Sequence, residues 1–140
     1  MRHFNWKKTY ETGIFEIDKQ HKKLFALANT FYDELFSENF RPGTKEIVSI
    51  LNELKDYSEF HCNYEKKIYS EDIIRRYFDI ENLLADKIYE LTEKNKSNDI
   101  IALYGFAEFL RKWLLKHILL LNTNNFREVL KKEVFNLSCN

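Results

Sequence analysis

The sequence is poor in residues that break helices, since its 140 residues include one proline and three glycines. All-β chains need such residues at their many turns, so this scarcity, beside abundant Leu, Ile, Lys, Glu and Phe, favours helices. The two cysteines, Cys62 and Cys139, lie far apart and form no Cys-x-x-Cys motif, which predicts two reduced thiols rather than a disulfide framework. No apolar run approaches the roughly eighteen residues that a membrane span needs, so we expect a soluble, cytoplasmic protein with no membrane partner.

No charge of one sign dominates, because 22 lysines and arginines balance 22 aspartates and glutamates. Without net charge or a basic stripe the chain has no field to attract a polyanion, so nucleic acid is not an expected partner. The length suits a single domain with one full core. We divide it into an N-terminal arm (1–17), a helical bundle (18–122) and a C-terminal segment (123–140) with a short helix near 126–135.

Apolar residues recur at helical spacing in four stretches of the bundle region. Short polar turns separate the stretches, so successive helices should run antiparallel, which predicts an all-α, up-down-up-down four-helix bundle. We expect the first helix to follow the N-cap Asp18 and end near 39–43, the second to run from the cap Thr44 to Ile68, the third to follow the cap Asp79, and the fourth to lie between the turns at 94–98 and 122–125.

Four polar residues interrupt the apolar faces of these helices: His21 on the first, His61 and Glu65 on the second, and His117 on the fourth. A spacing of four residues brings His61 and Glu65 to one face of a helix. In a bundle, inward ligands from different helices can meet in the core, where a transition metal takes imidazole nitrogens and carboxylate oxygens. One such histidine is usually a hydrogen-bonded core residue, but three beside a carboxylate indicate a metal site.

Motifs along nearly the whole chain point to one family. They are Trp6, Thr12-Gly13-Ile14, Ile17-Asp18, Gln20-His21, Leu24-Phe25, His61-x-x-x-Glu65 and Trp113-Leu114-x-x-His117-Ile118. Together they resemble the bacterial hemerythrins, non-haem iron proteins that bind oxygen in an antiparallel four-helix bundle. The resemblance implies iron as the cofactor, dioxygen as a ligand, and His21, His61, Glu65 and His117 as metal ligands.

Three of the family's seven ligand positions differ in this chain. The resemblance aligns Leu83 and Lys87 with a histidine pair on the third helix, and Asn122 with a bridging aspartate. One metal position would then keep only His117 and a share of Glu65. Lys87 would add a positive charge there, and a like-charge contact at ~4 Å costs on the order of 4 kcal/mol. We therefore expect that position to be empty.

The other metal position keeps His21, His61 and Glu65, a ligand set that suits one iron or zinc ion. We expect an eroded site that holds one metal or none, with Leu83 filling the lost imidazole volume. Lys87 would either pair with Glu65 inside the bundle or extend to water. Because reversible oxygen carriage in the family uses two ferrous ions, the departures put that activity in doubt.

Two further interpretations stay open. In one, the chain is a working oxygen carrier or sensor that recruits substitute ligands, such as Tyr64, Tyr77 or Glu81. In the other, it is a mononuclear non-haem metalloenzyme that uses two histidines and the glutamate as a facial triad. No nucleophile with an adjacent base, phosphate loop or carboxylate pair stands out, so we expect a protein that is not an enzyme.

Overall fold

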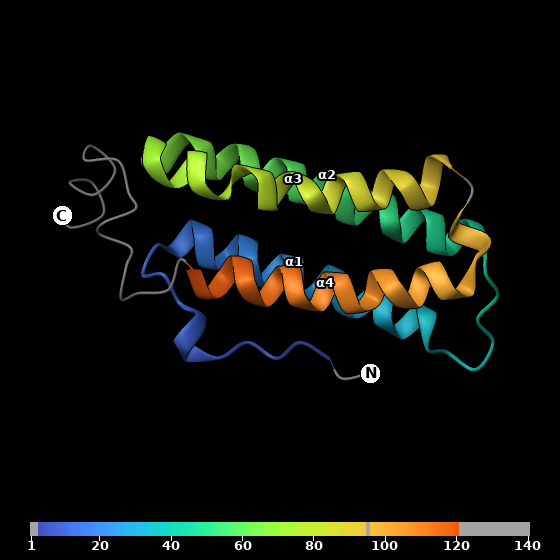
Figure 1. Ribbon diagram of the computed structural model, residues 1–140. Coiled ribbons are helices and arrows are strands. Elements are labelled where there is room, and N and C mark those ends of the chain that lie inside the picture. Colours follow the sequence, from blue (N-terminus) through green and yellow to red (C-terminus); the bar gives the residue numbers. More distant parts are fainter. Residues whose placement is uncertain (1–2, 95, 121–140) are drawn as a thin grey trace.

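A computed structural model describes residues 3–94 and 96–120, with the side chains at 73, 74, 76–82 and 120 left aside. Its long helices are α1 (Phe15–Leu35), α2 (Lys45–Ile68), α3 (Glu71–Glu93) and α4 (Ile100–Leu120), and its short 3-10 helices are η1 (Lys8–Tyr10) and η2 (Lys96–Asn98). Figure 1 shows α2 beside α3 and α1 beside α4, with successive helices antiparallel. The predicted all-α four-helix bundle is confirmed; the predicted helix near 126–135 lies outside the described residues.

Two helices begin where a side chain satisfies the free N–H groups of their first turn. The Thr44 hydroxyl accepts from the Ile47 N–H, so α2 begins as predicted. The carboxylate of Asp99 accepts from the N–H groups of Ile101 and Ala102, at 3.0 and 3.2 Å, and starts α4. Among the described helices, none is long and apolar enough to cross a membrane.

The other two helices begin earlier than the sequence suggested. Helix α1 begins at Phe15, and the Asp18 carboxylate accepts from the N–H and hydroxyl of Thr12 instead of capping the helix. Helix α3 begins at Glu71, eight residues before the predicted cap Asp79. Acidic residues favour the first turn of a helix, because they face its positive dipole end. The acidic pair Glu71 and Asp72 therefore forms the first turn of α3.

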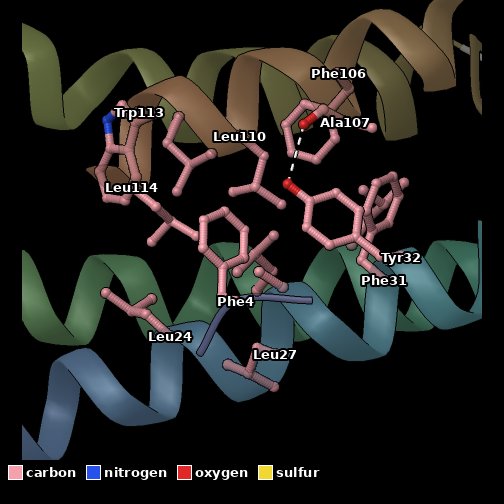
Figure 2. Packing of buried hydrophobic residues seen from close by; sticks show 14 of the residues in the cluster. Phe4, Leu24, Leu27, Phe31, Tyr32, Phe106, Ala107, Leu110, Trp113 and Leu114 are labelled. Atoms are coloured by element: carbon pink, nitrogen blue, oxygen red, sulfur yellow. Dashed lines mark hydrogen bonds between the residues drawn. The ribbon is translucent and has the colours of Figure 1, made fainter. Parts of the chain in front are cut away.

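The apolar core fills the bundle between all four long helices, α3 included, and extends under the N-terminal arm. Phe31 and Tyr32 of α1 are almost fully buried, and the Tyr32 hydroxyl donates to the Ala107 carbonyl of α4 at 3.0 Å (Figure 2). Phe4 brings the arm into this core by packing on Phe25 and Tyr32. Burying a side chain of this size contributes about 1.5–3 kcal/mol, which is what holds the helices at fixed spacing.

Candidate metal centre

The four polar residues singled out in the sequence come together at the end of the bundle where α1 begins and α2 and α4 end. His21 comes from α1, His61 and Glu65 from α2, and His117 from α4. Their side chains are buried, with exposed fractions between 0% and 3%. Each lies on the apolar stripe of its helix, so the helical period that builds the core also aims these side chains inward.

The ligand-type atoms of this cluster lie close to one another. The Nε2 atoms of His61 and His117 lie 3.1 and 3.3 Å from Oε1 of Glu65, and 3.1 Å from each other. Nε2 of His21 lies 3.8 Å from the other carboxylate oxygen, Oε2. One ligand atom from each of the four residues can be chosen so that all lie within 4.8 Å of one another.

The rings are held in place by packing as well as by the helices. The His21 ring meets the rings of His61 and His117 edge to face, with centroids 4.7 and 5.2 Å away. Trp113, one turn before His117, stacks on the imidazole of His117 at 5.0 Å and 9°. This stacking fixes the plane of the His117 ring and closes that side of the cluster with an apolar wall.

Burial and charge set the protonation states. Burial lowers the pKa of His21 to about 3, so its imidazole is neutral at pH 7. Burial alone would raise the pKa of Glu65, but the neighbouring His117 and His61 hold it well below its usual range. Glu65 is therefore a carboxylate. A neutral imidazole and an ionised carboxylate are the forms in which these side chains bind metals.

The cluster fits a metal ion better than it fits a metal-free core. Within the described residues, neither nitrogen of His21 nor either oxygen of Glu65 has a hydrogen bond of ordinary geometry, although all four atoms are buried. A polar atom that is buried without a hydrogen bond costs about 1–3 kcal/mol of stability. A cation bound at ~2.0–2.2 Å would satisfy one nitrogen of His21 and the carboxylate of Glu65, and two ligands of one ion lie at most about 4.4 Å apart. The cluster needs only a small contraction to reach that size.

An additional residue beside the cluster was missed by the sequence reasoning. Gln20 is buried, with 1% of its surface exposed, and its Oε1 lies 2.7 Å from Nδ1 of His61. Its Nε2 donates to Oε1 of Glu16 at 3.0 Å. Gln20 directly precedes His21 in α1, and both side chains face the inside of the bundle. Its partner His61 lies 41 positions further along the chain. Only the packing of α1 on α2 reveals that contact.

The structure corrects the assignment of the third helix. Leu83 is 45% exposed, so it does not fill a cavity at the cluster. Lys87 is also exposed and places its ammonium over the ring of Phe109, 5.7 Å from the centroid. Of the two alternatives left open for Lys87, the structure contradicts pairing with Glu65 and agrees with extension toward water. The buried stripe of α3 carries Leu84 and Ile88 instead.

Other residues named from the sequence lie elsewhere or are not described. Asn122 and the side chains of Tyr77 and Glu81 lie outside the described residues. Burial, reinforced by the charge of Glu16, raises the pKa of Tyr64, which disfavours the phenolate that a metal would bind. Cys62 is buried but does not belong to the group of ligand atoms.

Comparison with known proteins agrees with this geometry. Residues 12–128 match the family model described as "Hemerythrin HHE cation binding domain". A bacteriohemerythrin of Clostridium acetobutylicum is 31% identical over 121 residues, which cover 83% of this chain and 93% of that protein. A hemerythrin-like protein of Naegleria gruberi is 28% identical over 82% of this chain and 84% of its own length.

A bacteriohemerythrin of Pseudomonas paraeruginosa is 25% identical over 84% of this chain and 76% of its own length. No solved structure matches the chain. The family model spans most of the sequence and includes all three helices that contribute to the cluster. The chain therefore belongs to the hemerythrin family.

Proposed function

We propose that the cluster binds a single transition-metal ion, iron by analogy with the family, through the three imidazoles and the carboxylate. The observation that carries this proposal is the convergence of four ligand atoms from three helices within 4.8 Å of one another. A bound iron would supply the capacity to bind a small exogenous ligand such as dioxygen at a free coordination position. The protein positions the lone pairs of the three imidazoles and the carboxylate toward one another, and the buried apolar side chains around them exclude water.

The number of ligands favours one ion over two. A pair of metal ions would lie ~3.5–4 Å apart and would need ligands for both, whereas the described residues offer three histidines and one carboxylate. Because reversible oxygen carriage in the family uses two ferrous ions, we propose metal binding or sensing rather than oxygen transport. His117 adds a fourth protein ligand to the facial triad of His21, His61 and Glu65, which leaves fewer positions for a substrate and argues against an enzyme.

The register of α3 favours a second candidate function, a two-metal centre with substitute ligands. Leu84 and Ile88 are fully buried on the inner stripe of this helix. Tyr77 and Glu81 precede them by seven residues each. Seven residues are about two helical turns, so positions 77 and 81 are in register with this stripe along the helix. A second ion would need ligands beyond the four of the cluster, and α3 is the long helix that contributes none of those four.

Elemental analysis of protein purified without oxygen separates the candidates. One iron per chain is the expected result. Two irons per chain with an oxygen-dependent absorption band would establish the second candidate and overturn the first. A protein that takes up no iron, zinc or cobalt from excess would overturn both.

Variants test the ligand assignment. Glu65→Gln keeps the size of the side chain but removes its charge, so metal content should fall to less than a tenth of that of the parent. Lys87→His is the matched control, because position 87 is exposed on the outer side of α3. This variant should leave metal content unchanged, and a gain of one metal would show that position 87 faces the site after all.

A further inference from the structure

We propose that Gln20 is a positioning residue that holds His61 in the tautomer whose Nε2 lone pair faces the metal position. This inference rests on the proposed metal site and concerns how the chain prepares one of its ligands. Gln20 belongs to α1 and His61 to α2, so the contact also fixes these helices relative to each other at the site. The argument depends on which end of the Gln20 amide faces which partner.

The Glu16 carboxylate determines the orientation of the amide. A carboxylate only accepts hydrogen bonds, so the group that faces Oε1 of Glu16 at 3.0 Å must be the NH₂ of Gln20. The carbonyl oxygen of Gln20 then faces His61.

The orientation of the amide in turn determines the tautomer of His61. A carbonyl oxygen has no proton to donate, so Nδ1 of His61, 2.7 Å away, must carry the hydrogen. In the neutral ring the other nitrogen, Nε2, then keeps a free lone pair. This atom is the one that lies 3.1 Å from Glu65 and 3.1 Å from His117. The ring therefore presents its lone pair to the position where we place the ion.

The neighbouring ligand His21 provides an internal contrast. Within the described residues its Nδ1 has no hydrogen-bond partner, so packing alone holds that ring. His61 has an outer partner, and that partner is itself oriented by a partly exposed carboxylate. Outer partners of ligating histidines typically change metal affinity by about 10–100-fold when removed. The loss of Gln20 should therefore act through His61.

The test compares Gln20→Leu with the parent and with a matched control on the same helix. Asn29 is suitable because its amide also makes two hydrogen bonds, to the backbone N–H and carbonyl of Phe4, away from the site. Cobalt(II) affinity is measured by chelator competition and by the visible spectrum of the bound ion. Gln20→Leu should weaken cobalt binding about 10–100-fold, whereas Asn29→Leu should reduce stability and leave affinity unchanged.

Two further measurements separate positioning from a general loss of structure. In the double variant Gln20→Glu with Glu16→Gln, the amide at position 16 donates to the carboxylate at position 20, which still accepts from Nδ1, so affinity should return to within a few-fold of the parent. Nitrogen NMR of the metal-free protein should show the hydrogen of His61 on Nδ1 in the parent and a mixture of tautomers in Gln20→Leu. A parent that binds no cobalt would overturn the proposed function. A parent that binds cobalt, with equal affinity in Gln20→Leu, would overturn this inference alone.

Discussion

Buried polar groups have different partners in the two halves of the bundle, the apolar half around Tyr32 and the half that holds the cluster. In the apolar half, the Tyr32 hydroxyl is buried but donates to the Ala107 carbonyl of the facing helix (Figure 2). In the half that holds the cluster, the Glu65 oxygens are buried without hydrogen bonds of ordinary geometry from the described residues. The hydroxyl in the first half is satisfied by the protein itself, whereas the carboxylate in the second half would be satisfied by the proposed ion. The free energy of unfolding should therefore depend mainly on side-chain packing in the apolar half, and on pH and metal in the half that holds the cluster.

Truncation in the apolar half should have the largest effect. Phe31 is fully buried, so Phe31→Ala should lower the free energy of unfolding by about 3–5 kcal/mol through lost burial and a residual cavity. Urea denaturation measures this loss in chelator and again with added metal. If Phe31→Ala loses the same free energy of unfolding in chelator and with metal, the apolar half is stabilised independently of the cluster. A loss that disappears with metal would contradict this separation of the two halves.

Acid should weaken the half that holds the cluster. Because burial lowers the pKa of His21 to about 3 from 6.5, the unfolded chain binds a proton between these pH values that the folded chain does not. The free energy of unfolding of metal-free protein should therefore fall by up to about 1.4 kcal/mol per pH unit as the pH drops below 6.5. Below the usual pKa of a glutamate, Glu65 adds a loss of the same sign because its folded pKa is lowered.

Urea denaturation between pH 7 and pH 4 measures this slope. His21→Leu should reduce it, because the substituted side chain does not titrate, whereas Phe31→Leu in the apolar half should keep it. An unchanged slope in His21→Leu would show that other groups control the acid sensitivity.

A smaller effect should follow from removing the satisfied hydroxyl. Tyr32→Phe deletes the hydrogen bond to Ala107 and should cost about 1 kcal/mol of stability. Tyr104→Phe is the matched control, since Tyr104 is 49% exposed and its change should remain within about 0.5 kcal/mol. If the two variants lose equal stability, the buried hydroxyl is not what joins α1 to α4.

The smallest effect should be a gain. Gly105 lies inside α4, and a Cβ there would have no neighbour within 4 Å. Gly105→Ala should stabilise the protein by about 0.5–1 kcal/mol through helix propensity. Gly43→Ala should act in the opposite direction, because Gly43 has φ of +77° and its added Cβ would lie 3.0 Å from Asn98. Thermal denaturation of both variants checks the signs.

The sequence predicted much of this arrangement because one helical period governs both packing and ligand placement. It identified four helices and placed His21, His61, Glu65 and His117 on inward stripes. The third helix was less certain, since Leu83 and Leu84 both fit a broad apolar stripe and only packing buries one of them. The role of Gln20 depends on a contact between two helices, which no local pattern contains.

The ligands' positions along the chain have a consequence for folding. His21 and His117 lie 96 positions apart, near opposite ends of the described helices. An ion bound to both would join the two ends of the bundle in the folded state alone, so it would stabilise that state by mass action, by about 2.7 kcal/mol at a free metal concentration of about 100 times Kd. The site can assemble only after α4 has docked on α1 and α2. Metal binding would thus be the last step of folding, and it would slow unfolding.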